Sequence, residues 1–158
     1  MGTSYTELLD EAESLGLHVE ERSLGPGLCG FYFEKVRTIV LDGHMLDFQK
    51  RCTLCHELAH AQYHDMGCGG VSETKAELRA RRRAASRLIG PIEYASAENV
   101  YEGDGYLIAC ELDVTVQVVE DYRRLVLDGL TGLRHGDGVS GGFQDKLRFC
   151  QGVGAWQG

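Results

Sequence analysis

The sequence lacks any apolar run approaching the roughly 20 residues that a helix needs to cross a bilayer. Its first residues have neither the basic nor the apolar segment of a secretion signal. Basic residues are also scarce, since 16 Lys and Arg stand against 24 Asp and Glu and give a net charge of -8. Non-specific nucleic-acid binding requires a basic face. We therefore expect a cytoplasmic protein with no membrane span and no direct contact with nucleic acid.

The six cysteines show no disulfide framework, and in a cytoplasmic protein reduced thiols are the default. Cys52 and Cys55 precede His56 in a C-x-x-C-H pattern, which is also the attachment motif of c-type haem. Haem attachment normally takes place outside the cytosol. We therefore favour small, partly buried helix residues for this pair. A zinc site that adds His64 and Cys68 is the other alternative.

The motif that organises the chain is H-E-x-x-H at residues 56–60. Residues four apart lie on the same face of an α-helix, so His56 and His60 can converge on one zinc ion. Glu57 then projects beside the metal, where it can take a proton from a zinc-bound water whose pKa falls to roughly 7. Residues 51–65 contain no glycine or proline and are predicted to be helical. The motif is typical of metalloproteases.

A catalytic zinc site takes a third protein ligand and keeps one position for water or substrate. His64 cannot complete the site, because it lies about 12 Å along the helix from His56, whereas metal–nitrogen bonds are about 2 Å. The longer metzincin pattern H-E-x-x-H-x-x-G-x-x-H is absent. The next predicted helix, residues 72–89, offers Glu73 and Glu77, and its geometry favours Glu77 only modestly.

The predicted elements indicate an α+β fold. Three short strands are expected between a first helix and the motif helix, at residues 17–22, 28–34 and 36–41. Helices are expected on either side of the strands, at about residues 4–15, 47–65, 72–89, 92–100, 106–112 and 115–127. We expect one domain over residues 1–128, with a helical part at 92–128. Residues 129–158 are rich in glycine and are expected to form a partly disordered tail.

Two motifs together resemble the ImmA/IrrE family of zinc metallopeptidases, in the form carried by phages and mobile elements. In that family H-E-L-x-H is followed on the next helix by E-x-x-A-x-x-x-A-x-x-x-L-L and a proline. Here the second pattern runs from Glu77 to Ile89, and Pro91 follows. The resemblance covers roughly residues 36–127. It implies a zincin-like fold, with a small three-stranded sheet against the H-E-x-x-H helix and a following helical bundle, and a Zn²⁺ cofactor with Glu77 as third ligand.

The resemblance also implies a regulatory endopeptidase that cleaves or inactivates a DNA-binding repressor. Proteases of this kind usually bind substrate as an added β-strand. We therefore expect the third strand to be an edge strand that contacts substrate through Val36, Thr38, Ile39 and Val40. An oxyanion-stabilising side chain is expected as well. The sequence does not choose among four candidates: His44, Arg87, Tyr94 and Tyr101.

Two rival functions stay open. The first is a non-catalytic, zinc-containing interaction module that binds a repressor-type partner. The second is a DNA-binding protein that uses the helix-turn-helix rhythm of residues 106–127. The second segment of that rhythm is acidic, so core packing explains it better.

Five arginines lie on the second motif helix: Arg79, Arg81, Arg82, Arg83 and Arg87. Arg81 and Arg83 depart from the family pattern and put the packing of this helix in question. We expect a solvated face for Arg79, Arg83 and Arg87, with some pairing to acidic residues.

Overall fold

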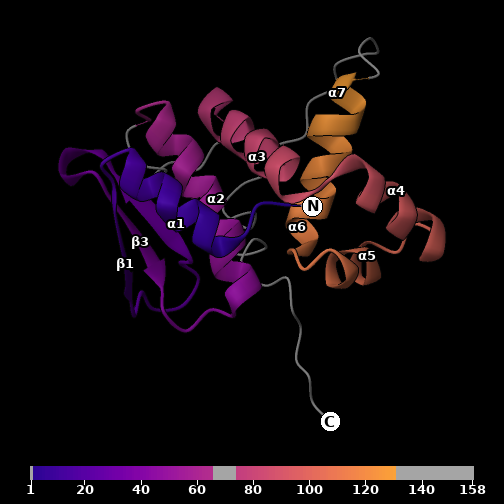
Figure 1. The fold of residues 1–158 in the computed structure, drawn as a ribbon, viewed down its shortest axis with the longest axis horizontal. Helices are drawn as coiled ribbons and strands as arrows, with labels where there is room; N and C mark the ends of the chain where they lie inside the picture. The colour runs from indigo at the N-terminus through magenta and orange to yellow at the C-terminus, as the bar shows by residue number, and fades with distance from the viewer. Residues whose placement is uncertain (1, 66–73, 131–158) are drawn as a thin grey trace.

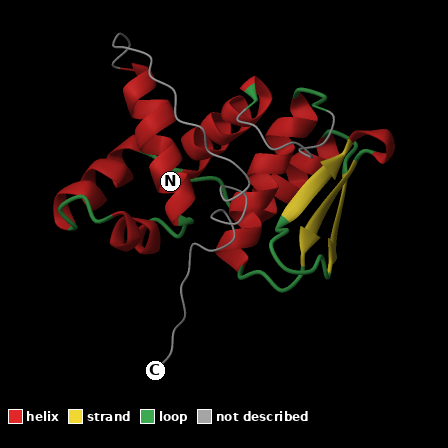
Figure 2. Cartoon of the chain, turned by 180° about the vertical axis from the view of Figure 1, so that it is seen from behind, coloured by secondary structure: helices red, strands yellow, loops and turns green. Residues whose placement is uncertain are grey.

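The computed structural model describes residues 2–65 and 74–130. Within them a three-stranded sheet lies at one side of the molecule, and the helices cover one of its faces and extend away from it (Figure 1). Figure 2 shows the same arrangement from behind, with the sheet at one edge. The expected α+β class is therefore confirmed. The predicted tail lies outside the described residues from residue 131 onward.

The first helix, α1 (Tyr5–Ser14), begins at a capping box. The Ser4 hydroxyl accepts from the backbone N–H of Glu7, and the Glu7 carboxylate accepts from the backbone N–H of Ser4. The helix ends where Gly16 takes a left-handed conformation at φ 68°. Leu8 and Ala12 are buried on its inner face. α1 is thereby fixed against the sheet and the motif helix.

The sheet has the strand order β1-β3-β2. Its strands are β1 (His18–Arg22), β2 (Gly30–Phe33) and β3 (Thr38–Asp42). β3 pairs in parallel with β1 and antiparallel with β2. β3 is therefore the central strand, and the two edges belong to β1 and β2.

The prediction of an edge strand at Val36, Thr38, Ile39 and Val40 is consequently wrong. Val36 lies before β3 in a short 3-10 helix, Glu34–Val36, while the other three residues are buried. The chain turns through this helix and re-enters the sheet between its two neighbours. Its two strand neighbours and the helices that cover one face of the sheet bury the side chains of Thr38 to Leu41. The apolar character of the segment thus reflected its central position.

The motif helix, α2 (Asp47–Gln62), passes through the centre of the molecule. Every residue from Cys52 to Ala61 is buried. This stretch of the helix therefore has no solvated face. His56 and His60 lie in the interior of the protein, and not on an exposed helix surface where two histidines could occur by chance. Gly30 allows β2 to approach this helix, because a Cβ there would lie 2.8 Å from Cγ2 of Thr53.

The second motif helix, α3 (Lys75–Leu88), begins at Thr74, whose hydroxyl accepts from the backbone N–H of Glu77. The predicted start of this helix at residue 72 lies outside the described residues. The helices that follow lie on the side of α3 away from the sheet (Figure 1): α4 (Pro91–Val100), α5 (Gly105–Glu111), α6 (Val116–Asp121), the π-helical η2 (Tyr122–Leu127) and α7 (Asp128–Leu130). In the described ranges no helix combines the length and the apolar character that crossing a bilayer would need.

The thiols of Cys52 and Cys55 are free and lie in the hydrophobic core. Burial raises the pKa of Cys52 to about 11 and that of Cys55 to about 12. Both thiols therefore stay protonated at neutral pH, which suits core residues and not thiolate ligands. Cys29 is disulfide-bonded, so the expectation of reduced thiols is wrong at that position.

Candidate metal centre

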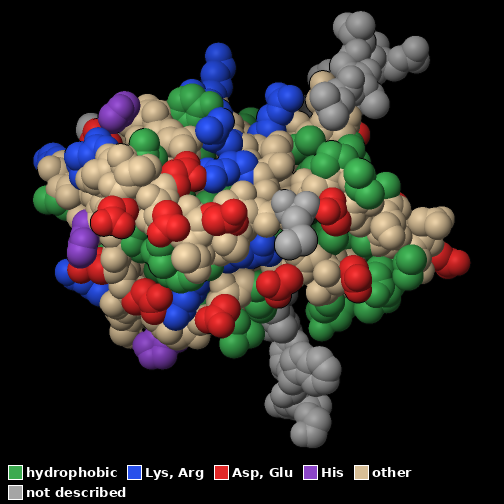
Figure 3. Space-filling model, viewed as in Figure 1, with side chains coloured by type: hydrophobic (Ala, Val, Ile, Leu, Met, Phe, Trp, Pro, Cys, Tyr) green, Lys and Arg blue, Asp and Glu red, His purple; other side chains and the backbone are tan. Residues whose placement is uncertain are grey.

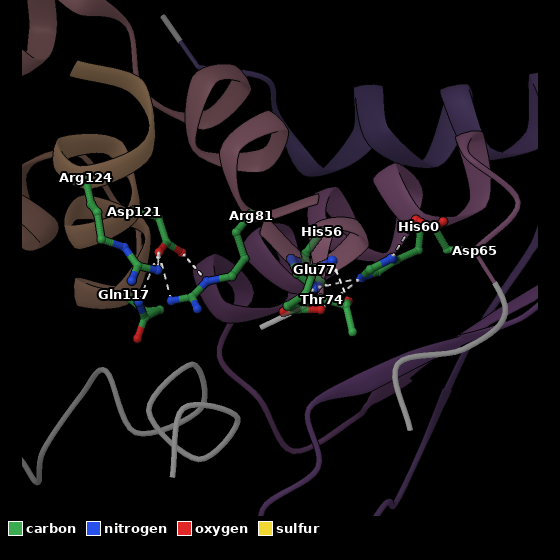
Figure 4. A network of polar contacts seen from close by, with 9 residues as sticks. All are labelled: His56, His60, Asp65, Thr74, Glu77, Arg81, Gln117, Asp121 and Arg124. Carbon is green, nitrogen blue, oxygen red and sulfur yellow. Dashed lines mark hydrogen bonds and ion pairs between the residues drawn. The ribbon is translucent and has the colours of Figure 1, made fainter. Parts of the chain in front are cut away.

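Two helices bring three potential metal ligands together. His56 and His60 come from α2, and Glu77 reaches them from the first turn of α3 (Figure 4). The two Nε2 atoms are 3.1 Å apart. Glu77 Oε1 lies 3.4 Å from His56 Nε2, and Glu77 Oε2 lies 3.3 Å from His60 Nε2. The three residues form a group that could hold a metal ion, with ligand atoms within 4.8 Å of one another.

The donor set and its spacing suit zinc. Two imidazoles and one carboxylate are a ligand set found in catalytic zinc proteases. Ligand atoms about 2.1 Å from a tetrahedral ion lie about 3.4 Å from one another, and the closest contacts in this group are 3.1 to 3.4 Å. The residues present therefore fit the ion.

Glu57 adjoins this group in the sequence and lies in the same buried stretch of α2. Its side chain is 4% exposed, and Oε2 has no hydrogen-bond partner within the described residues. A buried carboxylate oxygen without a partner is costly. Buried polar atoms without a partner often occur at catalytic sites or at sites that bind an ion or water.

The electrostatics of the site act most strongly on His60, which is 1% exposed. Burial lowers the pKa of this imidazole, but the hydrogen bond to Glu77 and the charges of Glu57 and Glu77 outweigh burial and raise the pKa overall. The hydrogen bond to Asp65 acts in the same direction. The surroundings of His60 are therefore strongly favourable for positive charge, as a cation site requires.

Sequence reasoning missed Asp65 and Arg79. Asp65 Oδ2 lies 3.3 Å from His60 Nδ1. Arg79 Nη2 donates to both oxygens of Asp65, at 2.9 and 3.0 Å. One feature of the sequence could have indicated Asp65. It is an acidic residue five positions after His60, just after the end of the motif helix. Arg79 lies on a solvated face, as expected, and its side chain is 42% exposed while it pairs with Asp65.

Arg81, unlike Arg79, is buried, and it packs in the interior although it departs from the family pattern. It is 7% exposed, and its guanidinium binds both oxygens of Asp121 at 2.8 and 3.0 Å (Figure 4). Gln117 also donates to Asp121, at 3.2 Å. The ion pair joins α3 to α6 beside the metal group.

These contacts weigh against the DNA-binding alternative. Gln117 and Asp121 belong to the segment that would have read bases, and both are buried in contacts with neighbouring side chains. Figure 3 shows acidic side chains gathered over α1 on one face of the molecule. Neither feature suits the contacts that nucleic acid requires.

The four candidate oxyanion-stabilising residues are held elsewhere. Arg87 pairs with Glu11, and His44 lies 3.2 Å from Asp42. Tyr94 accepts from Arg123 and donates to Glu98, and Tyr101 donates to Glu111. His64 lies at the end of α2, where its Nδ1 is 3.1 Å from Glu34 Oε1, and it is not a member of the metal group.

A comparison with protein families matches residues 12–121 to the IrrE N-terminal-like domain of the peptidase M78 family. The chain belongs to this family. The match confirms the resemblance to the ImmA/IrrE proteins that the two motifs indicated. No curated protein and no solved structure matches the chain.

Membership of the M78 family gives this chain a metallopeptidase-type domain. The matched range contains the whole sheet, α2 and α3, and it ends at Asp121, the partner of Arg81. The His56, His60 and Glu77 group lies inside it.

Proposed function

We propose that the chain is a zinc-dependent endopeptidase that cleaves a repressor-type DNA-binding protein in the cytoplasm. The observation that carries the proposal is the convergence of His56, His60 and Glu77 next to the buried carboxylate of Glu57. His56, His60 and Glu77 would hold the ion. Bound zinc polarises a carbonyl group and lowers the pKa of water to about 7.

Glu57 supplies the proton transfer. In hydrolysis an oxygen of water adds to the scissile carbonyl carbon, the C–N bond breaks, and one proton of the water passes to the departing nitrogen. Glu57 takes that proton on a carboxylate oxygen and delivers it to the amine. Its Oε2 has no partner within the described part of the chain, so no existing hydrogen bond has to break first.

The outer edge of β2, which pairs with no strand among the described residues, is the place that we assign to a substrate strand. β2 pairs with β3 on one side, while α2 packs against it closely at Gly30. Farther along, Glu34 follows β2 and lies 3.1 Å from His64 at the end of α2. β2 thus runs beside the stretch of α2 that carries the motif. A peptide added along this edge would gain main-chain hydrogen bonds.

A photo-crosslinking side chain tests this placement. Phe33 on β2 is 46% exposed, and His18 on β1 is exposed at the opposite edge. In the Glu57→Gln background, a crosslinker at position 33 should capture an intact polypeptide that the wild type cleaves, whereas one at position 18 should not. Equal capture at both positions contradicts the placement.

The activity itself is tested with zinc-loaded protein, a peptide library and a set of purified helix-turn-helix repressors. New amino termini are identified by mass spectrometry for the wild type and for Glu57→Gln. We expect cleavage by the wild type and loss by at least 100-fold in Glu57→Gln, in line with removal of a general base. Cleavage that survives in Glu57→Gln overturns the hydrolytic assignment.

Two further outcomes separate the parts of the proposal. If the protein cleaves library peptides but none of the repressors, the assignment of a repressor substrate is wrong, while the assignment of peptidase activity stands. If Glu57→Gln still inactivates a repressor and no cleavage occurs with either form, the protein is the non-catalytic interaction module instead.

A further inference from the structure

The end of α2 places Asp65 beside His60. His64 takes a left-handed conformation at φ 54°, and the chain closes back on the helix. The N–H of Asp65 donates to the carbonyl of His60 at 3.0 Å, and the N–H of His64 donates to the carbonyl of Ala61 at 3.2 Å. This pair of bonds defines a Schellman motif. Both the backbone and the side chain of Asp65 therefore bind His60.

The contact selects one form of the His60 ring. When Nδ1–H donates to Asp65, the lone pair of the neutral ring is on Nε2. That atom faces His56 and Glu77, at 3.1 and 3.3 Å. A carboxylate at the outer nitrogen of a ligating histidine fixes both the tautomer and the orientation of the ring.

Arg79 holds Asp65 from the other helix. Its guanidinium donates to both Asp65 oxygens and lies 3.9 Å above the ring of Tyr63, which is the C-terminal cap of α2. Arg79 comes two positions after Glu77 on α3. The two helices that supply the candidate ligands are thus joined by protein contacts right beside those ligands.

We propose that Asp65 and Arg79 are positioning residues that preorganise the metal site before the ion binds. Asp65 orients His60, and Arg79 holds Asp65 and the spacing between α2 and α3. The inference rests on the proposed zinc site and deepens it, because it assigns roles to two residues that neither family motif specifies.

The test measures zinc affinity of the full chain by competition with a chromophoric chelator. Asp65→Ala should weaken binding by about 10–100-fold, the usual effect of losing such a partner. Asp65→Asn keeps the shape and an acceptor oxygen, so its loss should be smaller. Arg79→Gln should also weaken binding, and Asp65→Ala/Arg79→Gln should resemble Asp65→Ala alone, because Arg79 acts through Asp65.

Arg83→Gln is the matched control, since Arg83 is an exposed arginine of the same helix. Its zinc affinity should equal that of the wild type. Thermal unfolding of each metal-free variant shows whether a general loss of stability explains the result. A ¹⁵N spectrum of metal-free protein adds a readout independent of zinc, with the His60 signals assigned by their loss in His60→Gln. The wild type should show protonated Nδ1, and Asp65→Ala should not.

Unchanged zinc affinity in Asp65→Ala overturns the positioning role while the zinc site stands. If the wild type binds no zinc, or if His60→Ala binds it as tightly as the wild type, the proposed zinc site fails and the positioning role fails with it.

Discussion

Glu77 Oε2 lies 3.3 Å from His60 Nε2, although the two residues belong to different helices. The contact depends on how closely α2 and α3 approach. Small buried side chains on α3, namely Ala80, Ala84 and Ala85, allow that approach. Cys55 Sγ lies 4.0 Å from the carbonyl oxygen of Ala84 at the contact. The packing of two helices therefore sets the geometry of the metal group.

Enlarging Ala84 should damage this geometry. Ala84 is 2% exposed, and Ala84→Leu adds three carbons to a filled interface. We expect a loss of about 1–3 kcal/mol in the free energy of unfolding together with weaker zinc binding. Urea unfolding and chelator competition measure the two effects. Arg83→Leu, at an exposed position of the same helix, should leave zinc affinity unchanged. If Ala84→Leu binds zinc as tightly as the wild type, the spacing between α2 and α3 does not control zinc affinity.

Gly30→Ala should destabilise the contact between β2 and α2. The added Cβ would lie 2.8 Å from the carbonyl oxygen of Val40 and 2.8 Å from Cγ2 of Thr53. We expect a cost of about 1–3 kcal/mol in the free energy of unfolding, as for other overpacked sites. Thr53→Ser removes one of the two clashes and should restore part of the loss. Gly43→Ala meets nothing closer than 3.8 Å, so its urea midpoint should barely change.

Breaking the Arg81–Asp121 pair should lower the free energy of unfolding substantially. Both side chains are buried, at 7% and 3% exposed. Arg81→Met leaves the Asp121 carboxylate without its main partner, and removing one member of a buried pair costs about 3–5 kcal/mol. Chemical denaturation checks the value. Arg83→Met on the exposed face should stay within about 0.5 kcal/mol of the wild type. Equal stability of the two variants would mean that the buried pair contributes nothing.

The local parts of this structure follow from the sequence, and the non-local parts do not. The H-E-x-x-H helix and the capping of α1 by Ser4 depend on neighbours in the chain. Strand order depends on pairings between distant segments, so the central place of β3 was missed. The burial of Arg81 was missed for the same reason, since its partner Asp121 comes from another helix.

The site shows the same division. The spacing of four residues places His56 and His60 on one face of a helix. The sequence alone could not decide firmly whether Glu73 or Glu77 is the third ligand. The start of α3 at Thr74 places Glu77 within its first turn, toward the histidines. Asp65 was missed because it reaches His60 only through the left-handed residue His64, a position usually marked by glycine.

That left-handed position gives a prediction of its own. A non-glycine residue there is strained by about 1–2 kcal/mol, while glycine gives up about 0.5–1 kcal/mol in chain entropy. His64→Gly should therefore be more stable than His64→Ala, which keeps the strain and loses the contact with Glu34. Thermal unfolding of the metal-free proteins ranks the two. An alanine variant at least as stable as the glycine variant would contradict this account of the helix end.

The central claim is that His56, His60 and Glu77 hold one zinc ion beside Glu57, and metal analysis of purified variants tests it most directly. The wild type, Glu57→Gln and Glu73→Ala should each carry one zinc ion per chain, because none of these changes removes a ligand. His60→Ala and Glu77→Ala should carry none. Zinc retained in full by Glu77→Ala, or lost in Glu73→Ala, would contradict the account.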